Sequence, residues 1–168
     1  MDKKATAYHE AGHVFTAIRL IVPFKYVTII ETGDALGHVR FNNNIVKILK
    51  KLEVEQASPN DRMNIEKNII IDFAGYYAEK KYTGRKNNIG ASQDWENAVT
   101  KADRFLGSKK MIVAYLNYLA ISAEEIVSNK INWKIIVEIA KKLLQEKTLT
   151  LEQCRESYLS AIKKYSIT

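Results

Sequence analysis

Two histidines near the beginning of the chain, His9 and His13, lie four residues apart, and Glu10 directly follows the first of them. Residues at positions i and i+4 of an α-helix lie on one face, so both imidazole rings can reach the same metal ion. Glu10 points about a quarter-turn away, from where its carboxylate can reach a metal-bound water without being a ligand. Zinc hydrolysis needs this division of roles, so the pattern predicts a Zn²⁺ site with Glu10 as general base.

The residues around this motif predict an amphipathic helix over about residues 3–20. Gly12 costs such a helix about 1 kcal/mol relative to alanine, which indicates close packing by another segment or by the site itself. The alternative is a helix with two unrelated histidines and a solvated Glu10. The chain has only three histidines, so finding two of them at this spacing favours metal binding. The apolar face of the helix should consist of Tyr8, Ala11, Phe15 and Ile18.

Length and composition predict one ordinary globular domain over residues 1–168, because 46% of the residues are hydrophobic and 27% are charged. Cys154 is the only cysteine, so a disulfide framework within the chain and a cysteine-rich zinc site are both excluded. No apolar run approaches the roughly 20 residues of a membrane span, and the motif leaves no room for a signal peptide ahead of it. We therefore expect a cytoplasmic, reducing location, with membrane association only through a partner.

The net charge of +7 comes from lysines that are spread along the expected helices. Aromatic residues are not interleaved with them, so solvated helix faces explain the charge better than a nucleic-acid-binding patch does. Nucleic acid is therefore not an expected partner.

The chain should be mainly α with a small β-hairpin or sheet, which is an α+β fold class. Residues 26–30 and 37–41 read as strands around a turn at Thr32-Gly33-Asp34, and residues 85–92 read as a loop. Helices are expected over about residues 61–82, 93–106, 109–128, 132–147 and 151–164. The first of these is apolar nearly all round at its centre and should be a buried core helix. Thr150 and Gln153 form a candidate capping box, and one core stripe should consist of Ile131, Ile135, Ile139 and Leu143.

Two histidines do not complete a catalytic zinc site, so a third protein ligand is expected. Arg19 stands where the third histidine of an extended motif would fall. The third ligand must therefore come from farther along the chain, and a carboxylate is expected. His38 remains an open alternative, although its place in an expected strand suits a surface or substrate-side residue better.

Three segments together resemble the peptidase domain of the FtsH-type AAA+ zinc metalloproteases. Residues 7–13 carry the His-Glu-x-x-His motif, residues 74–79 are similar to that family's Gly-Gly-Arg-x-Ala-Glu-Glu helix, and residues 90–94 are similar to its Thr-Gly-Ala-Ser-Asn-Asp segment. The segments come in the family order and at about its spacing. The expected strands and the helical tail also look similar, so the resemblance covers nearly the whole chain. It implies a zincin-like, FtsH peptidase-type helical domain.

The resemblance assigns Asp94 as the third zinc ligand and places Glu79 beside the site, as a partner that orients a ligand histidine. The alternative for Asp94 is a carboxylate at a helix start that satisfies backbone N–H groups. The alternative for Glu79 is a solvated position on a helix surface.

The sequence also departs from the family. Tyr76 replaces an arginine, Lys80 replaces a glutamate and Gln93 replaces an asparagine, while Asp72 interrupts an apolar stretch without an assignable counterpart. The family's ATPase module and membrane spans are not in this sequence. These changes leave the ligands and the base intact but put assembly and substrate choice in doubt.

The expected function is therefore that of a zinc-dependent endopeptidase that hydrolyses unfolded or flexible polypeptides without ATP. An extended substrate would pair with the edge strand formed by Gly37, His38, Val39, Arg40 and Phe41. The alternative is a non-catalytic, zinc-bound protein-interaction module with the same fold. A separate ATPase partner and self-association both stay open.

Overall fold

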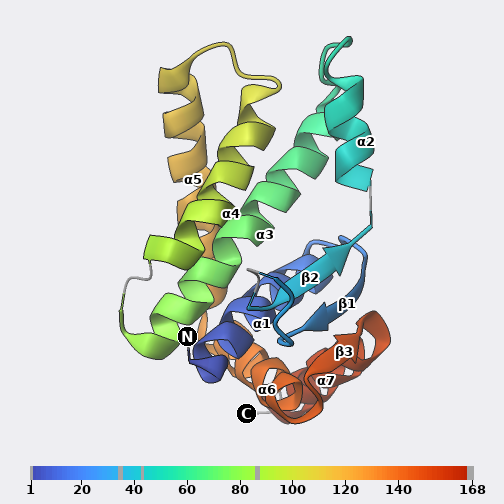
Figure 1. The fold of residues 1–168 in the computed structure, drawn as a ribbon, viewed down its shortest axis with the longest axis vertical. Helices are drawn as coiled ribbons and strands as arrows, with labels where there is room; N and C mark the ends of the chain where they lie inside the picture. Colours follow the sequence, from blue (N-terminus) through green and yellow to red (C-terminus); the bar gives the residue numbers. More distant parts are fainter. Residues whose placement is uncertain (1, 34–35, 43, 86–87, 166–168) are drawn as a thin grey trace.

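The computed structural model describes residues 2–33, 36–42, 44–85 and 88–165, and most of these residues are helical (Figure 1). Three short strands form one small sheet beside the helices. The expected class, mainly α with a small sheet, is confirmed. The elements are α1 (Lys3–Arg19), β1 (Phe24–Thr28), β2 (His38–Phe41), α2 (Asn44–Lys51), α3 (Pro59–Thr83), α4 (Asn88–Asp103), α5 (Lys109–Ser128), α6 (Lys130–Glu146), β3 (Thr148–Thr150) and α7 (Leu151–Tyr165).

The sheet is antiparallel with the strand order β2-β1-β3, so β2 lies at an edge of the sheet in the described part of the chain. β1 begins and ends two residues before the predicted strand, and Gly33 has the positive φ of 59° that a turn needs, whereas Asp34 lies outside the described residues. β3 was not predicted, because three residues are too few to show a periodicity. The predicted capping box begins at Thr150, the last residue of β3: Thr150 N–H donates to Gln153 Oε1 at 2.8 Å, and Gln153 N–H donates to Thr150 Oγ1 at 3.3 Å.

The pattern of backbone hydrogen bonds along β1 determines which N–H and C=O groups of β2 face the open edge of the sheet. Ile29 N–H donates to the carbonyl of Lys147 at 2.9 Å, so the odd-numbered residues of this segment bond toward β3. Backbone groups alternate in direction along an antiparallel strand, so the even-numbered residues bond toward β2. Thr28 pairs with His38 and Val27 with Val39. The N–H and C=O of Val39 therefore face the open edge of the sheet.

Helix α3 is the central element, and both of its ends follow from local chemistry. Ser58 Oγ accepts from Asp61 N–H at 3.2 Å, while Asp61 Oδ2 accepts from Ser58 N–H at 3.0 Å, which makes a capping box. Pro59 occupies the first helical turn, where its missing N–H costs nothing. Gly84 ends the helix with a φ of 69°, a left-handed conformation that glycine adopts without strain.

Two hydrophobic clusters pack against α3. Ile71, Ala74 and Ala78 belong to a cluster with α1, α6, α7 and the sheet, which confirms the predicted burial of α3 on this side. Ile65 and Ile69 belong to a second cluster with α4 and α5. Helix α3 thus holds together the two sets of elements that carry the candidate site.

Helices α1 and α3 approach each other closely at Gly12. A Cβ atom on Gly12 would lie 2.5 Å from the carbonyl oxygen of Ala74 and 2.7 Å from the Cβ of Ala78. Both distances are below van der Waals contact, so a side chain at this position would push the helices apart. The prediction that another segment packs against Gly12 is confirmed.

Two local expectations are wrong. Helix α4 begins at Asn88, so residues 88–92 are helical instead of forming a loop, while Lys86 and Asn87 lie outside the described residues. The asparagine, glycine and serine content of residues 88–92 signals a loop, but such a local preference is weak. Ile131 is 44% exposed at the beginning of α6, whereas Ile135, Ile139 and Leu143 of the same predicted stripe are buried.

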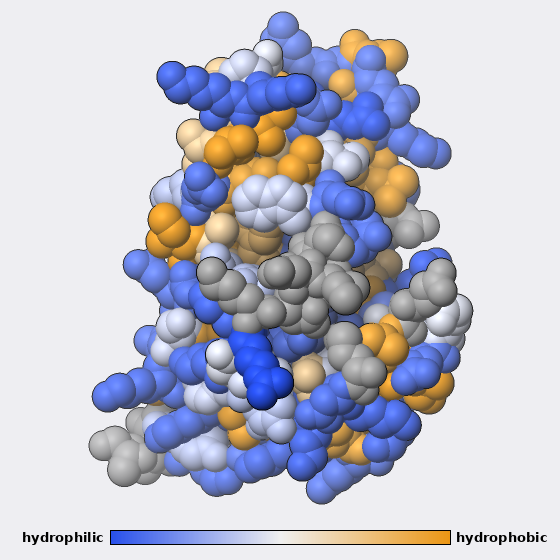
Figure 2. Space-filling view, turned by 60° about the vertical axis from the view of Figure 1, so that its left-hand side comes forward, coloured by the Kyte–Doolittle hydropathy of each residue, from blue (hydrophilic) through white to orange (hydrophobic). Residues whose placement is uncertain are grey.

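Helix α5 is long and apolar enough to cross a membrane, judged by length and composition alone. Its inner residues Ile112, Leu116 and Leu119 pack in the second cluster, as in a core helix, and core helices pass the same test. Its exposed apolar side chains include Met111, Val113 and Ile121. Figure 2 turns this side of the molecule forward and shows apolar side chains among hydrophilic ones. Among the described residues, α5 is the one helix that meets this test, and a single such helix is weak evidence for a membrane span.

Candidate metal centre

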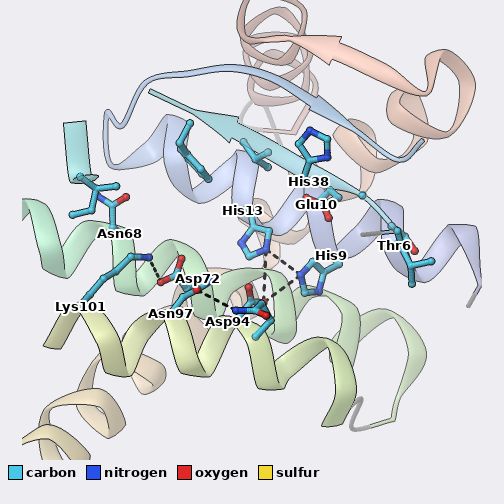
Figure 3. Close-up of a pocket in the computed structure, with 16 residues that line it drawn as sticks. Thr6, His9, Glu10, His13, His38, Asn68, Asp72, Asp94, Asn97 and Lys101 are labelled. Atoms are coloured by element: carbon cyan, nitrogen blue, oxygen red, sulfur yellow. Dashed lines mark hydrogen bonds and ion pairs between the residues drawn. The ribbon is translucent and has the colours of Figure 1, made fainter. Parts of the chain in front are cut away.

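Three potential ligand atoms converge between α1 and α4 (Figure 3). His9 Nε2 lies 3.0 Å from His13 Nε2 and 3.3 Å from Asp94 Oδ2, and His13 Nε2 lies 3.8 Å from Asp94 Oδ2. Ligands of a four-coordinate zinc ion with bonds of about 2.1 Å are roughly 3.4 Å apart. The donor atoms and their separations therefore fit a zinc ion with three protein ligands.

Asp94 does not occupy the helix-start position that its alternative reading requires. Helix α4 begins at Asn88, which places Asp94 in the second helical turn, beyond the reach of the unpaired N–H groups at the beginning. Its Oδ2 atom is buried and accepts no well-aligned hydrogen bond among the described residues, although His9 Nε2 lies 3.3 Å away. A buried carboxylate oxygen without a donor needs a compensating cation, which a metal ion would supply.

The other ring nitrogen of each histidine is held by α3. His9 Nδ1 lies 3.1 Å from Glu79 Oε2, and His13 Nδ1 lies 2.7 Å from the carbonyl oxygen of Ile71. A carboxylate or a carbonyl on one ring nitrogen fixes the orientation of the ring and leaves the other nitrogen for the metal. Glu79 is only 3% exposed, so the alternative of a solvated helix-surface residue is wrong.

Gly75 of α3 is a site residue that the sequence analysis missed. A Cβ atom at this position would lie 2.4 Å from His13 Nε2 and 2.9 Å from His9 Nε2. Only glycine therefore lets α3 pass beneath the two imidazoles without displacing them. The available signal was a glycine in the interior of an otherwise strong helix.

Glu10 lies in the same pocket as the three potential ligands but outside their cluster. It is 5% exposed, and its Oε2 atom has no hydrogen-bond partner among the described residues. A Cβ atom on Gly37 would lie 3.0 Å from Glu10 Oε1, so the segment before β2 packs directly on this carboxylate. Burial raises the pKa of Glu10 to about 7, which outweighs the opposing effect of His9.

The charges around the histidines favour a cation at this position. Burial would lower the pKa of His9, but the nearby carboxylates of Asp94 and Glu79 raise it to about 10. Burial also lowers the pKa of His13. Burial would raise the pKa of Asp94, yet His13 and His9 hold it below its usual value. Three acidic groups, Asp94, Glu79 and Glu10, thus lie around the two imidazoles, an arrangement that a divalent cation would balance.

The ligands line a pocket of about 600 Å³ that also includes most of the predicted edge strand. Gly37, His38, Val39 and Phe41 line it, whereas Arg40 is exposed and does not. His38 Nε2 lies 3.3 Å from Tyr26 Oη on the neighbouring strand, and the two rings are in edge contact. Among the described residues, the cluster that could hold a metal consists of His9, His13 and Asp94, so the alternative of His38 as a ligand has no support.

Sequence comparison finds similarity to bacterial proteases. The chain is 33% identical over 116 residues, or 68% of its length, to the ATP-dependent zinc metalloprotease FtsH of Magnetococcus marinus. It is 35% identical over 104 residues (60% of the chain) to the FtsH of Rickettsia felis, and 36% identical over 110 residues (62%) to FtsH 1 of Rhodopirellula baltica. These matches cover only 14–15% of each relative. No family model matches the chain. The chain therefore contains a partial FtsH-like segment, consistent with a peptidase domain.

Proposed function

We propose that this FtsH-like segment is a zinc-dependent endopeptidase domain with a zincin-like fold. His9, His13 and Asp94 would hold Zn²⁺, and Glu10 would act as general base. The observation that carries the proposal is the convergence of two histidine Nε2 atoms and one carboxylate oxygen beside a separate buried glutamate. The pocket contains one carboxylate among the potential ligands, Asp94, and one apart from them, Glu10. Metal-assisted hydrolysis needs both a ligand and a separate base.

When bound, zinc would polarise the scissile carbonyl and lower the pKa of an attacking water. Glu10 accepts a proton from that water as its oxygen bonds to the carbonyl carbon. The same carboxyl group then delivers this proton to the amide nitrogen as the C–N bond breaks. In the metal-free chain, burial raises the pKa of Glu10 to about 7. A base with a pKa near the working pH can both accept and release a proton.

The substrate of this proposal is an unfolded or flexible polypeptide. The N–H and C=O of Val39 face the open edge of the sheet, so an extended backbone can pair with β2 while its carbonyl lies at the ligands. Backbone pairing gives affinity with little demand on most side chains. Only a chain without a stable fold presents such a backbone, and hydrolysis itself needs no ATP. Stably folded proteins would need a separate unfolding partner.

The decisive experiment measures zinc content and cleavage on the same preparations. The parent chain should hold about one zinc ion and cleave an unfolded casein-type substrate without ATP, with chelator abolishing cleavage. Asp94→Ala should lose the zinc. Glu10→Gln keeps the side-chain shape and should retain both zinc and fold while losing cleavage.

Two results would overturn parts of this proposal. Full zinc retention in Asp94→Ala would remove Asp94 from the ligand set. A zinc-loaded parent that cleaves no unfolded polypeptide would favour the non-catalytic interaction module, and a Glu10→Gln variant as fast as the parent would refute the role of Glu10.

A further inference from the structure

A buried ion pair lies in the same pocket as the candidate metal centre and has no part in the proposed chemistry. Lys101 Nζ donates to Asp72 Oδ2, and the two side chains are only 13% and 14% exposed. Figure 3 shows the pair next to Asp94, with Asp72 extending from α3 and Lys101 extending from α4. Asp72 directly follows Ile71, whose carbonyl holds His13, so the pair is joined to the site through the backbone of α3.

The pair extends the faces of α3 and α4 that already carry the site. Lys101 follows Asp94 by seven residues and Asp72 precedes Glu79 by seven, which is two helical turns in each case. Asn97 and Asn68 line the same pocket, and Figure 3 shows both near the pair. This end of the pocket is therefore a wall of two charges and two amides.

Apolar residues line the same pocket. They are Val39 and Phe41 of β2 and Ile45 of α2. A substrate side chain that enters the pocket can therefore meet both hydrogen-bonding groups and hydrocarbon. The two kinds of lining residue together define the chemistry of the side chain that fits.

We propose that the Asp72–Lys101 pair is the specificity determinant of a subsite beside the metal centre, and that this subsite accepts an uncharged amide side chain of the substrate. The occupant would be asparagine or glutamine at a position adjoining the scissile bond. This inference rests on the proposed peptidase function and adds a substrate class to it.

The preference follows from the cost of covering a buried ion pair. An apolar side chain would displace water from Asp72 and Lys101 without replacing its hydrogen bonds. A charged side chain would leave one unbalanced charge in a buried site. An amide offers one acceptor and two donors to the pair, and its methylene groups can pack against the apolar lining residues.

The test uses short fluorogenic peptides that differ at one position on either side of the cleaved bond, carrying glutamine, leucine, glutamate or lysine. We expect kcat/KM for the glutamine peptide to exceed that of the other three by about tenfold or more on one side of the bond. In the double variant Asp72→Leu/Lys101→Leu the order should reverse in favour of leucine. The single variant Asp72→Asn leaves the positive charge of Lys101 and should shift the preference toward glutamate.

A second ion pair provides the matched control. Lys80 Nζ lies 3.2 Å from Glu124 Oε1 at the surface, and neither residue lines the pocket. The double variant Lys80→Leu/Glu124→Leu should keep the substrate order of the parent. Zinc content and melting temperature of each variant show whether it retains the site and the fold.

Binding separates this inference from the proposed function. The zinc-loaded Glu10→Gln variant should bind the glutamine peptide more tightly than the other three in fluorescence anisotropy, whether or not the parent cleaves.

A preference of the parent for leucine or for a charged side chain, or an unchanged order in Asp72→Leu/Lys101→Leu, would overturn the subsite. If no peptide is cleaved but the binding order holds, the peptidase proposal fails and the subsite stands; if none binds, both fail.

Discussion

His9 uses both of its ring nitrogens, with Nδ1 directed at Glu79 and Nε2 directed at Asp94. The two carboxylates raise the pKa of His9 to about 10 despite its burial. In the metal-free chain the imidazole is therefore protonated at neutral pH. The proton on Nε2 of His9 occupies the position that a bound metal ion would take.

This state predicts that zinc binding releases protons. A metal ligand must be the neutral imidazole, so at pH 7 about one proton should leave His9 for each zinc ion bound. The apparent affinity should accordingly rise with pH below about 10 and fall as the solution is acidified. Calorimetry in buffers of different ionisation enthalpy measures the proton count. The Glu79→Gln variant lacks one of the carboxylates that raise the pKa of His9, so it should release fewer protons. A parent chain that releases no protons on zinc binding would contradict this account.

A second prediction at the residue scale concerns Gly75. The variant Gly75→Ala places a Cβ atom 2.4 Å from His13 Nε2, so the ring must move away from the ligand cluster. We expect zinc affinity to fall by about 10- to 100-fold, the range seen when the support of a metal ligand is lost. Competition with a chromophoric chelator measures this change. Gly107→Ala is the control, because nothing lies within 4 Å of its Cβ position; equal affinity in both variants would refute the packing argument.

At the scale of elements, β2 connects the sheet to the candidate site. Its inner residues Val39 and Phe41 line the pocket, while the backbone N–H of Val39 faces the open edge. The same short strand thus contributes both a pocket wall and a backbone donor. The edge is useful only if a substrate supplies the missing strand.

The variant Val39→Pro tests the edge, because proline removes the N–H that would pair with substrate. Cleavage of an unfolded polypeptide should fall severalfold, mainly through a higher KM, while zinc content stays at that of the parent. Val39→Ala shortens the same side chain but keeps the N–H, and so separates loss of packing from loss of the donor. If the proline variant cleaves like the alanine variant at equal melting temperature, the edge does not bind substrate.

At the scale of the whole molecule, the candidate ligands come from two helices that both pack on α3. His9 and His13 are on α1 and Asp94 is on α4, whereas the two hydrophobic clusters are built from other residues. A metal ion would therefore fasten together elements that already have their own cores. The chain differs in this respect from small domains that fold only with their metal.

Chelation should accordingly lower the melting temperature without unfolding the chain. A ligand present at 100 times its dissociation constant stabilises the folded state by about 2.7 kcal/mol. For a chain of this size that corresponds to roughly 5–10 °C. Circular dichroism with zinc and with chelator measures the shift, and the helical signal at 25 °C should persist in both. Loss of that signal on chelation would show that the metal is needed for folding.

Local sequence determined the elements and one part of the site. The spacing of His9 and His13 on a helix follows from 3.6 residues per turn, and the same periodicity places Glu10 on a neighbouring face. The sequence predicts α3 over about residues 61–82, within a few residues of the ends that Ser58 and Gly84 cap in the structure. Capping and left-handed backbone are properties of single residues and their near neighbours. Such signals need only a few consecutive residues, so they are readable without a structure.

Only the tertiary structure decided which distant residues meet. The position of Asp94 beside the histidines, the need for glycine at position 75 and the pairing of Asp72 with Lys101 all depend on how α3 packs between α1 and α4. Helical periodicity shows which face of a helix is apolar, but it does not show which other helix covers that face. The pairing of β3 with β1 has the same origin, because three residues gain a strand conformation only from the partner they bond to. Contacts between distant parts of the chain are properties of the packed molecule, and no local pattern specifies them.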